Sequence, residues 1–151
     1  MKEGEMDMIW IVLGIVAVLA VWYISTYNGF VSLNVKCEEA YSTMDIYLKK
    51  RYDLIPNLVE TVKGYAKHEA QTLESVIAAR GAAVNAKTPE AKAAAEGTLS
   101  SALSRLMAIS ESYPELKANA NFVDLQRQLQ QMENEIANSR KYYNGVVKSY
   151  N

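Results

Sequence analysis

The sequence is poor in the residues that form disulfides, zinc sites and chain breaks. Its 151 residues include one Cys, one His, three Pro and seven Gly. One Cys excludes an intramolecular disulfide, and one Cys with one His cannot complete a four-ligand zinc site. Because so few Pro and Gly interrupt the backbone, long helices are the expected structure.

The sequence also lacks a surplus of charge of either sign. Lys plus Arg number 16 and Asp plus Glu number 17, which gives a formal net charge of -1. A dedicated nucleic-acid binder normally carries a basic surplus, so we expect no nucleic-acid partner. Hydrophobic residues make up 50% and charged residues 22%, as in globular proteins, and the length allows one domain with an appended segment.

The usual catalytic and cofactor motifs are missing as well. There is no Gly-rich phosphate loop, no Gly-x-Ser-x-Gly elbow and no His-Glu-x-x-His helix. A di-iron bundle needs Glu three residues before His, and Tyr65 takes that place before His68. The sequence therefore predicts no catalytic residues, no metal site, no cofactor and no enzyme activity.

A long hydrophobic run near the N-terminus is the first positive signal. Residues 8–27 contain no charged side chain, and 20 helical residues span about 30 Å, the thickness of a bilayer core. Aromatic residues typical of the membrane interface lie within the run near its ends: Trp10 near one end and Trp22, Tyr23 and Tyr27 near the other. The run predicts a single transmembrane helix after a short tail (residues 1–7), with the lipid bilayer as partner. A cleaved signal peptide is disfavoured because the tail is acidic.

The basic residues near this helix predict its orientation. Lys2 precedes the run, whereas Lys36 and the cluster Lys49, Lys50 and Arg51 follow it. Cytoplasmic flanks carry the excess of Lys and Arg. We therefore expect a single-pass protein of the cell membrane, with its N-terminus outside and residues 28–151 in the cytoplasm.

Apolar residues in residues 28–151 recur at alternating steps of three and four, which is the pattern of packed helices. A Pro residue leaves two alternatives open in the first half: a second helix begins at Asp53, with Pro56 in its first turn, or Pro56 kinks one long helix. Thr88 and Pro89 predict a helix start, and Tyr113 before Pro114 predicts a helix end. The four apolar stripes are Phe30, Leu33, Cys37, Ala40, Met44 and Tyr47; Ile55, Val59, Val62, Ala66, Leu73 and Ile77; Leu99, Ala102, Leu106 and Ile109; and Phe122, Leu125, Leu129, Met132, Ile136, Ser139, Tyr143, Val146 and Tyr150.

These stripes predict an all-α fold in which the transmembrane helix is followed by an up-and-down bundle of three to four long antiparallel helices. Cys37 on the first stripe is expected to be a small buried side chain. The second stripe is expected to end between residues 81 and 87. Mixed charges on the first two helices favour a structural ion-pair network over a ligand site: Arg51, Asp53, Asn57, Glu60, Lys63, Glu69 and Arg80.

Four blocks of sequence resemble the LemA family. The longest is the stretch from Lys50 to Glu69, and the others are residues 27–31, 111–119 and 140–144 with Tyr150 and Asn151. The resemblance implies a bacterial membrane protein with one N-terminal span, an external N-terminus and a helical-bundle domain, here residues 28–151. The family includes magnetosome-associated members involved in building the organelle membrane. Members similar to this chain usually continue past the Tyr-Asn pair.

The function predicted from these features is that of a membrane-anchored helical scaffold. It acts by binding other membrane-associated proteins or by forming homo-oligomers, and tyrosines suit such contacts. The alternatives are a membrane-shaping oligomer, or a ligand sensor or enzyme that uses the polar motif between residues 51 and 69. The residues proposed for interactions are Arg51, Asp53, Pro56, Asn57, Lys63, His68, Glu69, Tyr113, Pro114, Tyr143 and Asn144.

Overall fold

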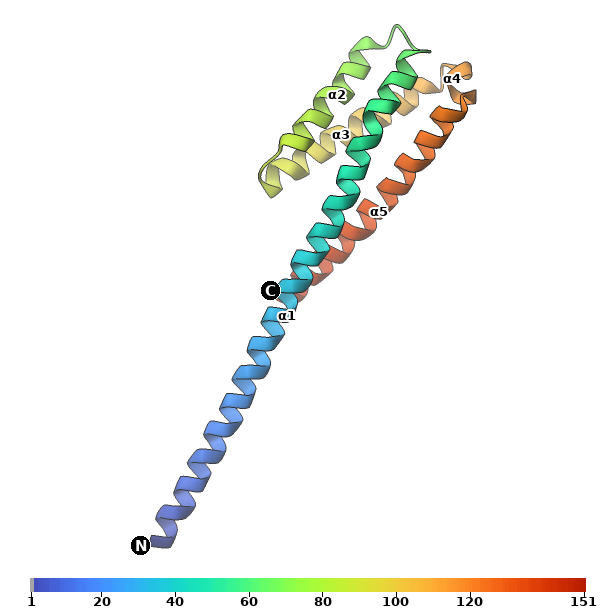
Figure 1. Ribbon diagram of the computed structural model, residues 1–151. Helices are drawn as coiled ribbons and strands as arrows, with labels where there is room; N and C mark the ends of the chain where they lie inside the picture. The colour runs from blue at the N-terminus through green and yellow to red at the C-terminus, as the bar shows by residue number, and fades with distance from the viewer. Residues whose placement is uncertain (1) are drawn as a thin grey trace. The chain divides into compact units, whose positions relative to one another are not determined.

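The computed structural model describes the backbone of residues 2–151 and the side chains of residues 4–151, and it is all helical (Figure 1). Within that part of the chain there is no β-strand, so the predicted all-α class is confirmed. The five helices are α1 (Lys2–Lys63), α2 (Ala70–Asn85), α3 (Pro89–Ser110), α4 (Pro114–Ala118) and α5 (Ala120–Tyr150).

The chain divides into two compact units, and each is described separately. The bundle unit (residues 43–139) contains the last part of α1, the helices α2 to α4 and the first part of α5. Its four long helical segments run in alternating directions, as the up-and-down topology predicts (Figure 1). The hairpin unit (residues 2–42 and 140–151) joins the first part of α1 to the antiparallel last part of α5.

One helix carries the chain through Pro56. This residue lies inside α1 with its side chain exposed, and the helix continues to Lys63. The structure thus excludes a separate helix beginning at Asp53. On the same helix, Ile55, Leu58 and Val62 are fully buried. The core of the bundle unit consists of Leu48, Tyr52, Ile55, Leu58, Val59, Val62, Ala66, Leu73, Val76, Ala79, Ala83, Leu99, Leu103, Leu106, Leu116, Phe122, Leu125, Leu129 and Ile136.

The chain leaves the helical conformation between Lys63 and Ala70, and this turn changes the buried face of the next helix. The predicted stripe is wrong at Ile77, whose side chain is 54% exposed, whereas Val76 is fully buried. A continuous helix keeps its phase of 100° per residue, but a turn resets that phase. The buried face of α2 is therefore Leu73, Val76, Ala79 and Ala83.

The predicted start of α3 is confirmed. Thr88 is the N-cap, its side chain accepts a hydrogen bond of 3.1 Å from the amide of Ala91, and Pro89 is the first helical residue. Further along, Leu99, Leu103 and Leu106 are buried while Ala102 and Ile109 are only half-buried, so the core-facing stripe lies slightly off the predicted one.

The segment around Tyr113 both ends one helix and starts another. α3 ends at Ser110, and Pro114 opens the short helix α4. The side chain of Asn119 then accepts a hydrogen bond of 2.9 Å from the amide of Phe122, which satisfies a free backbone donor at the start of α5. The predicted break near Tyr113 and Pro114 is therefore present, and it separates α3 from α5 through one extra helical turn.

The stripe predicted for the last helix is confirmed in the first part of α5, whereas Tyr150 at its far end is 42% exposed. Phe122, Leu125, Leu129 and Ile136 are buried in the bundle unit. Further along, in the hairpin unit, two ring pairs join α5 to α1. The rings of Tyr143 and Tyr41 lie 5.9 Å apart, and those of Tyr150 and Phe30 lie 6.1 Å apart, both edge to face.

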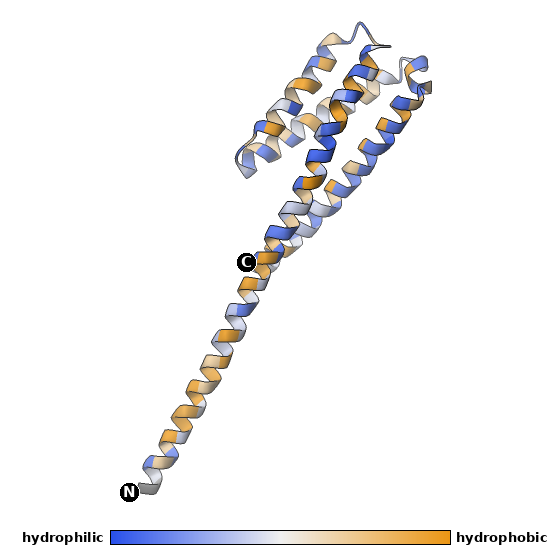
Figure 2. Cartoon of the chain, in the orientation of Figure 1, coloured by the Kyte–Doolittle hydropathy of each residue, from blue (hydrophilic) through white to orange (hydrophobic). Residues whose placement is uncertain are grey.

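The apolar run of α1 is exposed along its whole length. The part of the helix that contains residues 8–27 is coloured mostly hydrophobic in Figure 2, and among the described helices only α1 is long and apolar enough to cross a membrane. Water-soluble surfaces rarely carry an apolar patch of this size. The apolar run therefore has the length and composition of a membrane span. Trp10 and Trp22 are exposed near the two ends of this run.

Candidate functional site

A buried arginine is the most unusual polar feature of the bundle unit. Arg51 is only 1% exposed because it lies on the inner face of α1, between Leu48 and Ile55. Its guanidinium group donates hydrogen bonds to the carboxylates of Glu96 and Glu133, and a bond of 3.1 Å to the hydroxyl of Ser100. One side chain thus joins α1, α3 and α5.

The electrostatics of this cluster explain its composition. A buried guanidinium is costly unless it is paired and hydrogen-bonded, and here two carboxylates face one cation. Glu96 is itself 3% exposed and also accepts a hydrogen bond from the hydroxyl of Tyr52. The Nε atom of Arg51 has no hydrogen-bond partner within the described part of the chain. We call Arg51, Tyr52, Glu96, Ser100 and Glu133 the arginine cluster.

The sequence interpretation singled out Arg51 and missed the other four members of this cluster. The predicted ion-pair network involved charges on the first two helices, but Arg51 pairs with Glu96 and Glu133, which lie on α3 and α5. A signal for Glu96 exists, since it precedes Leu99 by three residues on the buried stripe of α3. Arg80, also expected in the network, donates a 2.8 Å hydrogen bond to the backbone oxygen of Tyr52.

A second charged contact between α1 and α3 involves Asp45. Its carboxylate lies 2.6 Å from the ammonium group of Lys92 and 3.0 Å from that of Lys49. The hydrogen bond from Lys92, with a smaller contribution from Lys49, lowers the pKa of Asp45 below its ordinary value of 3.8, although partial burial opposes the shift.

This lowered pKa predicts an acid-dependent loss of stability. Because the unfolded chain binds the proton of Asp45 more tightly, the contribution is fully present above about pH 4 and is lost as the pH falls through the lowered pKa. We expect Asp45→Asn to be less stable than the original chain at neutral pH, with the difference shrinking below pH 4. Thermal unfolding of both chains as a function of pH measures this difference.

The matched control is Asp124→Asn, because Asp124 pairs with Arg127 at 2.9 Å on an exposed surface of α5. Exposed pairs contribute about 0–1 kcal/mol, so this variant should change little at any pH. A difference for Asp45→Asn that persists unchanged to pH 2 would contradict the assigned role of the carboxylate.

Two of the family-like blocks meet at the end of the bundle unit that holds the turn after α1. The hydroxyl of Tyr113 donates a 3.0 Å hydrogen bond to Glu69, and this bond raises the pKa of Tyr113 above its ordinary value of 10. The side-chain amide of Asn119 donates a 2.9 Å bond to the hydroxyl of Tyr65. The structure therefore brings Glu69 and Tyr113, both predicted site residues, into direct contact.

The other predicted site residues are not gathered at one place. Asp53 and Asn57 are exposed on α1, on the side away from the buried Arg51, and His68 is exposed in the following turn. Within residues 4–151, no group of three or more His, Cys, Asp or Glu side chains is arranged to hold a metal ion. Pro56, Lys63, Pro114 and Asn144 are also exposed, and Tyr143 is half-buried.

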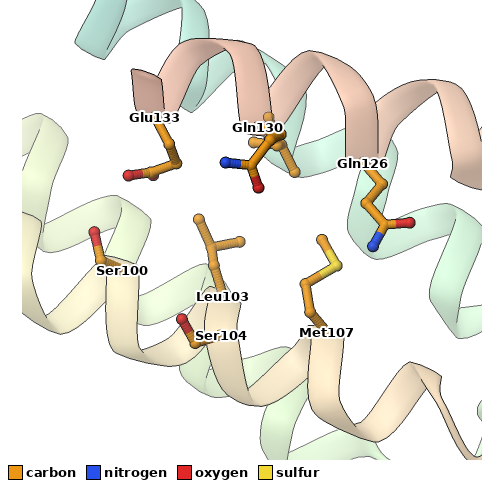
Figure 3. Close-up of a pocket in the computed structure, with 8 residues that line it drawn as sticks. Ser100, Leu103, Ser104, Met107, Gln126, Gln130 and Glu133 are labelled. Carbon is orange, nitrogen blue, oxygen red and sulfur yellow. The ribbon is translucent and has the colours of Figure 1, made fainter. Parts of the chain in front are cut away.

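A groove of about 530 Å³ lies between α3 and α5, beside the arginine cluster (Figure 3). Ser100 and Glu133 line the groove and also accept hydrogen bonds from Arg51. The buried guanidinium of Arg51 therefore lies behind one end of the groove. Glu133 keeps 42% of its side chain exposed there. The groove is lined by Ser100, Leu103, Ser104 and Met107 of α3 and by Gln126, Leu129, Gln130 and Glu133 of α5.

The lining of the groove mixes amides, hydroxyls and one carboxylate with an apolar floor. Such a surface offers hydrogen bonds along its rim and apolar contact at Leu103, Met107 and Leu129. This combination is typical of a surface that binds a partner side chain or helix, since interfaces pair an apolar centre with a polar rim.

Comparisons with known proteins agree with this architecture. Magnetosome proteins MamQ 2 and MamQ 1 of Paramagnetospirillum magneticum (strain ATCC 700264 / AMB-1) are each 26% identical over 166 residues, covering 93% of this chain and 61% of theirs. MamQ of Magnetospirillum gryphiswaldense is 26% identical, over 83% of this chain and 56% of its own. The chain thus spans about six-tenths of these relatives. The LemA family profile matches residues 40–151, and the chain belongs to the LemA family.

Proposed function

We propose that this LemA-family chain is a single-pass membrane scaffold that binds partner proteins or copies of itself at the membrane and has no catalytic role. The observation that carries the proposal is the composition of α1. One helix contains an exposed apolar run long enough to cross a bilayer and also the buried residues that build the bundle unit. The chain therefore combines an anchor with a folded interaction domain.

The groove between α3 and α5 is the surface proposed for partner binding. Its apolar floor fits the apolar face of an amphipathic helix, and the half-exposed Glu133 at one end favours a basic residue on that helix. The proposed orientation places the N-terminus outside and the bundle unit in the cytoplasm. It rests on the excess of Lys and Arg after the apolar run.

Cysteine chemistry at two matched glutamines tests both parts of the proposal. In a Cys37→Ala background, Gln130→Cys places a thiol in the groove, and Gln71→Cys places one on the exposed surface of α2. We expect a bifunctional thiol reagent added to permeabilised cells or nanodiscs to give cross-linked products from Gln130→Cys and few from Gln71→Cys. A membrane-impermeant maleimide should label either thiol only after cell lysis.

Two results would contradict the proposal. The groove would be excluded as an interaction surface if Gln130→Cys gave no more cross-linked product than Gln71→Cys and the protein were monomeric in nanodiscs. Labelling of intact cells would reverse the orientation and direct the search for partners to the cell envelope. Circular dichroism of both variants serves as the folding control, because both replaced side chains are exposed.

A further inference from the structure

The last part of α5 is basic and aromatic, and no contact described so far explains its charges. Residues 140–151 contain Arg140, Lys141 and Lys148 and no acidic residue. All three basic side chains are exposed, and among residues 4–151 none of them takes part in an ion pair. The inner face of this segment is already occupied, because Tyr143 packs against Tyr41.

The hairpin unit places the end of this segment beside the end of the apolar run. Tyr150 contacts Phe30, with ring centres 6.1 Å apart, and Phe30 lies three residues beyond Tyr27. At 1.5 Å per residue this separation is about 4.5 Å along α1. Tyr23 and Tyr27 stack with their ring centres 6.5 Å apart, so aromatic rings continue from the end of the run to α5.

These positions define the height of each basic residue above the apolar run. Lys148 lies two residues before Tyr150 on the antiparallel helix, which places it about 7–8 Å beyond the level of Tyr27. The headgroup zone extends about 5–7 Å beyond the hydrocarbon core, and a Lys side chain can extend toward it. Lys141 lies about 18 Å beyond that level by the same measure, well outside a Debye length of about 8–10 Å.

We propose that the end of α5 is a second membrane contact, in which Tyr150 lies in the interface and Lys148 binds the headgroups of anionic phospholipids. The inference rests on the proposed membrane anchor and adds a ligand class to it. Tyr is favoured at the lipid–water interface, and each basic residue close to an anionic surface strengthens binding about fivefold. The contact would hold both helices of the hairpin unit, α1 and α5, at the bilayer surface.

The test uses the full chain in nanodiscs of phosphatidylcholine, with and without phosphatidylglycerol. In a Cys37→Ala background, Ser149→Cys carries an environment-sensitive fluorophore next to Lys148, since Ser149 is exposed. We expect a blue-shifted emission in the anionic discs that weakens at about 1 M salt, where the Debye length is about 3 Å. In anionic discs, Lys148→Gln should lower the ratio of membrane-bound to unbound ends of α5 about fivefold. In discs of phosphatidylcholine alone it should not change this ratio.

Matched variants separate lipid binding from effects on the helix. Lys141→Gln removes the same charge farther from the bilayer and should leave the emission unchanged, while Lys148→Arg should behave as the original chain. Lys148 also lies in the last turn of α5, where a cation stabilises the helix dipole. If the loss of the Lys148 charge frays the end of α5, the emission changes equally in discs of phosphatidylcholine alone. That change is subtracted from the change measured in anionic discs.

The two tryptophans report on the anchor independently, because Trp10 and Trp22 are the only tryptophans in the sequence and both lie within the apolar run. Quenching of their fluorescence by brominated lipid shows insertion. Quenching together with equal effects of Lys148→Gln and Lys141→Gln, or no response to phosphatidylglycerol, would overturn the lipid contact and leave the anchor in place. Absence of quenching would overturn the anchor and this inference together.

Discussion

Glu96→Gln should lower the free energy of unfolding of the bundle unit by about 1.5–3 kcal/mol, the range for a hydrogen bond to a charged group. The substitution keeps the size of the side chain but removes one of the two negative charges that face Arg51. Arg51 keeps Glu133 as a charged partner, but it loses the carboxylate that is buried with it, and this loss is more costly than losing an exposed pair. Urea unfolding of the full chain in mild detergent, followed by circular dichroism, measures the loss.

Two further variants test the physical reason for this loss. Glu133→Gln removes the other carboxylate, but 42% of that side chain is exposed and water can replace it, so the loss should be smaller. The triple variant Arg51→Met, Tyr52→Phe and Glu96→Leu replaces the buried polar groups with apolar ones and should recover most of the stability. Equal and small losses for Glu96→Gln and Glu133→Gln would contradict the burial of the cluster.

Two aspartates in the middle of the apolar run should remove the protein from the membrane. Asp near the centre of a membrane helix costs about 2.5–3.5 kcal/mol, so Val16→Asp with Leu19→Asp should cost about 6 kcal/mol of insertion free energy. Both side chains are more than half exposed and have no role in the bundle core. Membrane pellets washed with alkaline carbonate measure the loss of the protein from the bilayer.

The matched control introduces the same two charges elsewhere. Ile77→Asp with Val84→Asp changes two exposed aliphatic residues of α2, which are 54% and 50% exposed. This variant should stay in the membrane fraction. If both double variants stay in the washed pellet, the apolar run is not the segment that holds the chain in the membrane. Circular dichroism should show the same helix content in both, because all four side chains lie outside the core.

The sequence predicted the helical elements well where the signal was local. The N-cap at Thr88 and the break near Pro114 are determined by neighbouring residues, and the structure confirms both. The stripe from Phe122 to Ile136 was identified because a packed helix repeats its apolar positions. The burial of Ile77 was wrong because the turn before Ala70 reset the helical phase, and periodicity alone does not register such a reset.

The candidate site was less predictable, because its members come together from distant parts of the chain. Arg51 was singled out, but Glu96 and Glu133 lie 45 and 82 residues away, on two other helices. A charged residue in a helical sequence is normally a solvated one, so spacing gave no reason to expect these two beside a buried guanidinium. Glu69 and Tyr113 were both named, yet their contact depends on the turn that follows α1.

The amino-acid sequence by itself determined the all-helical class, the exposed apolar run and the family of this protein. Those features depend on composition and on the spacing of apolar residues within single segments, and both can be read directly from neighbouring residues. Only the tertiary structure decided which polar side chains are buried, which face of α2 enters the core, and where the groove between α3 and α5 lies. The physical reason is that these features depend on how helices pack, and a buried charge is tolerated only where packing brings its partners within hydrogen-bonding distance.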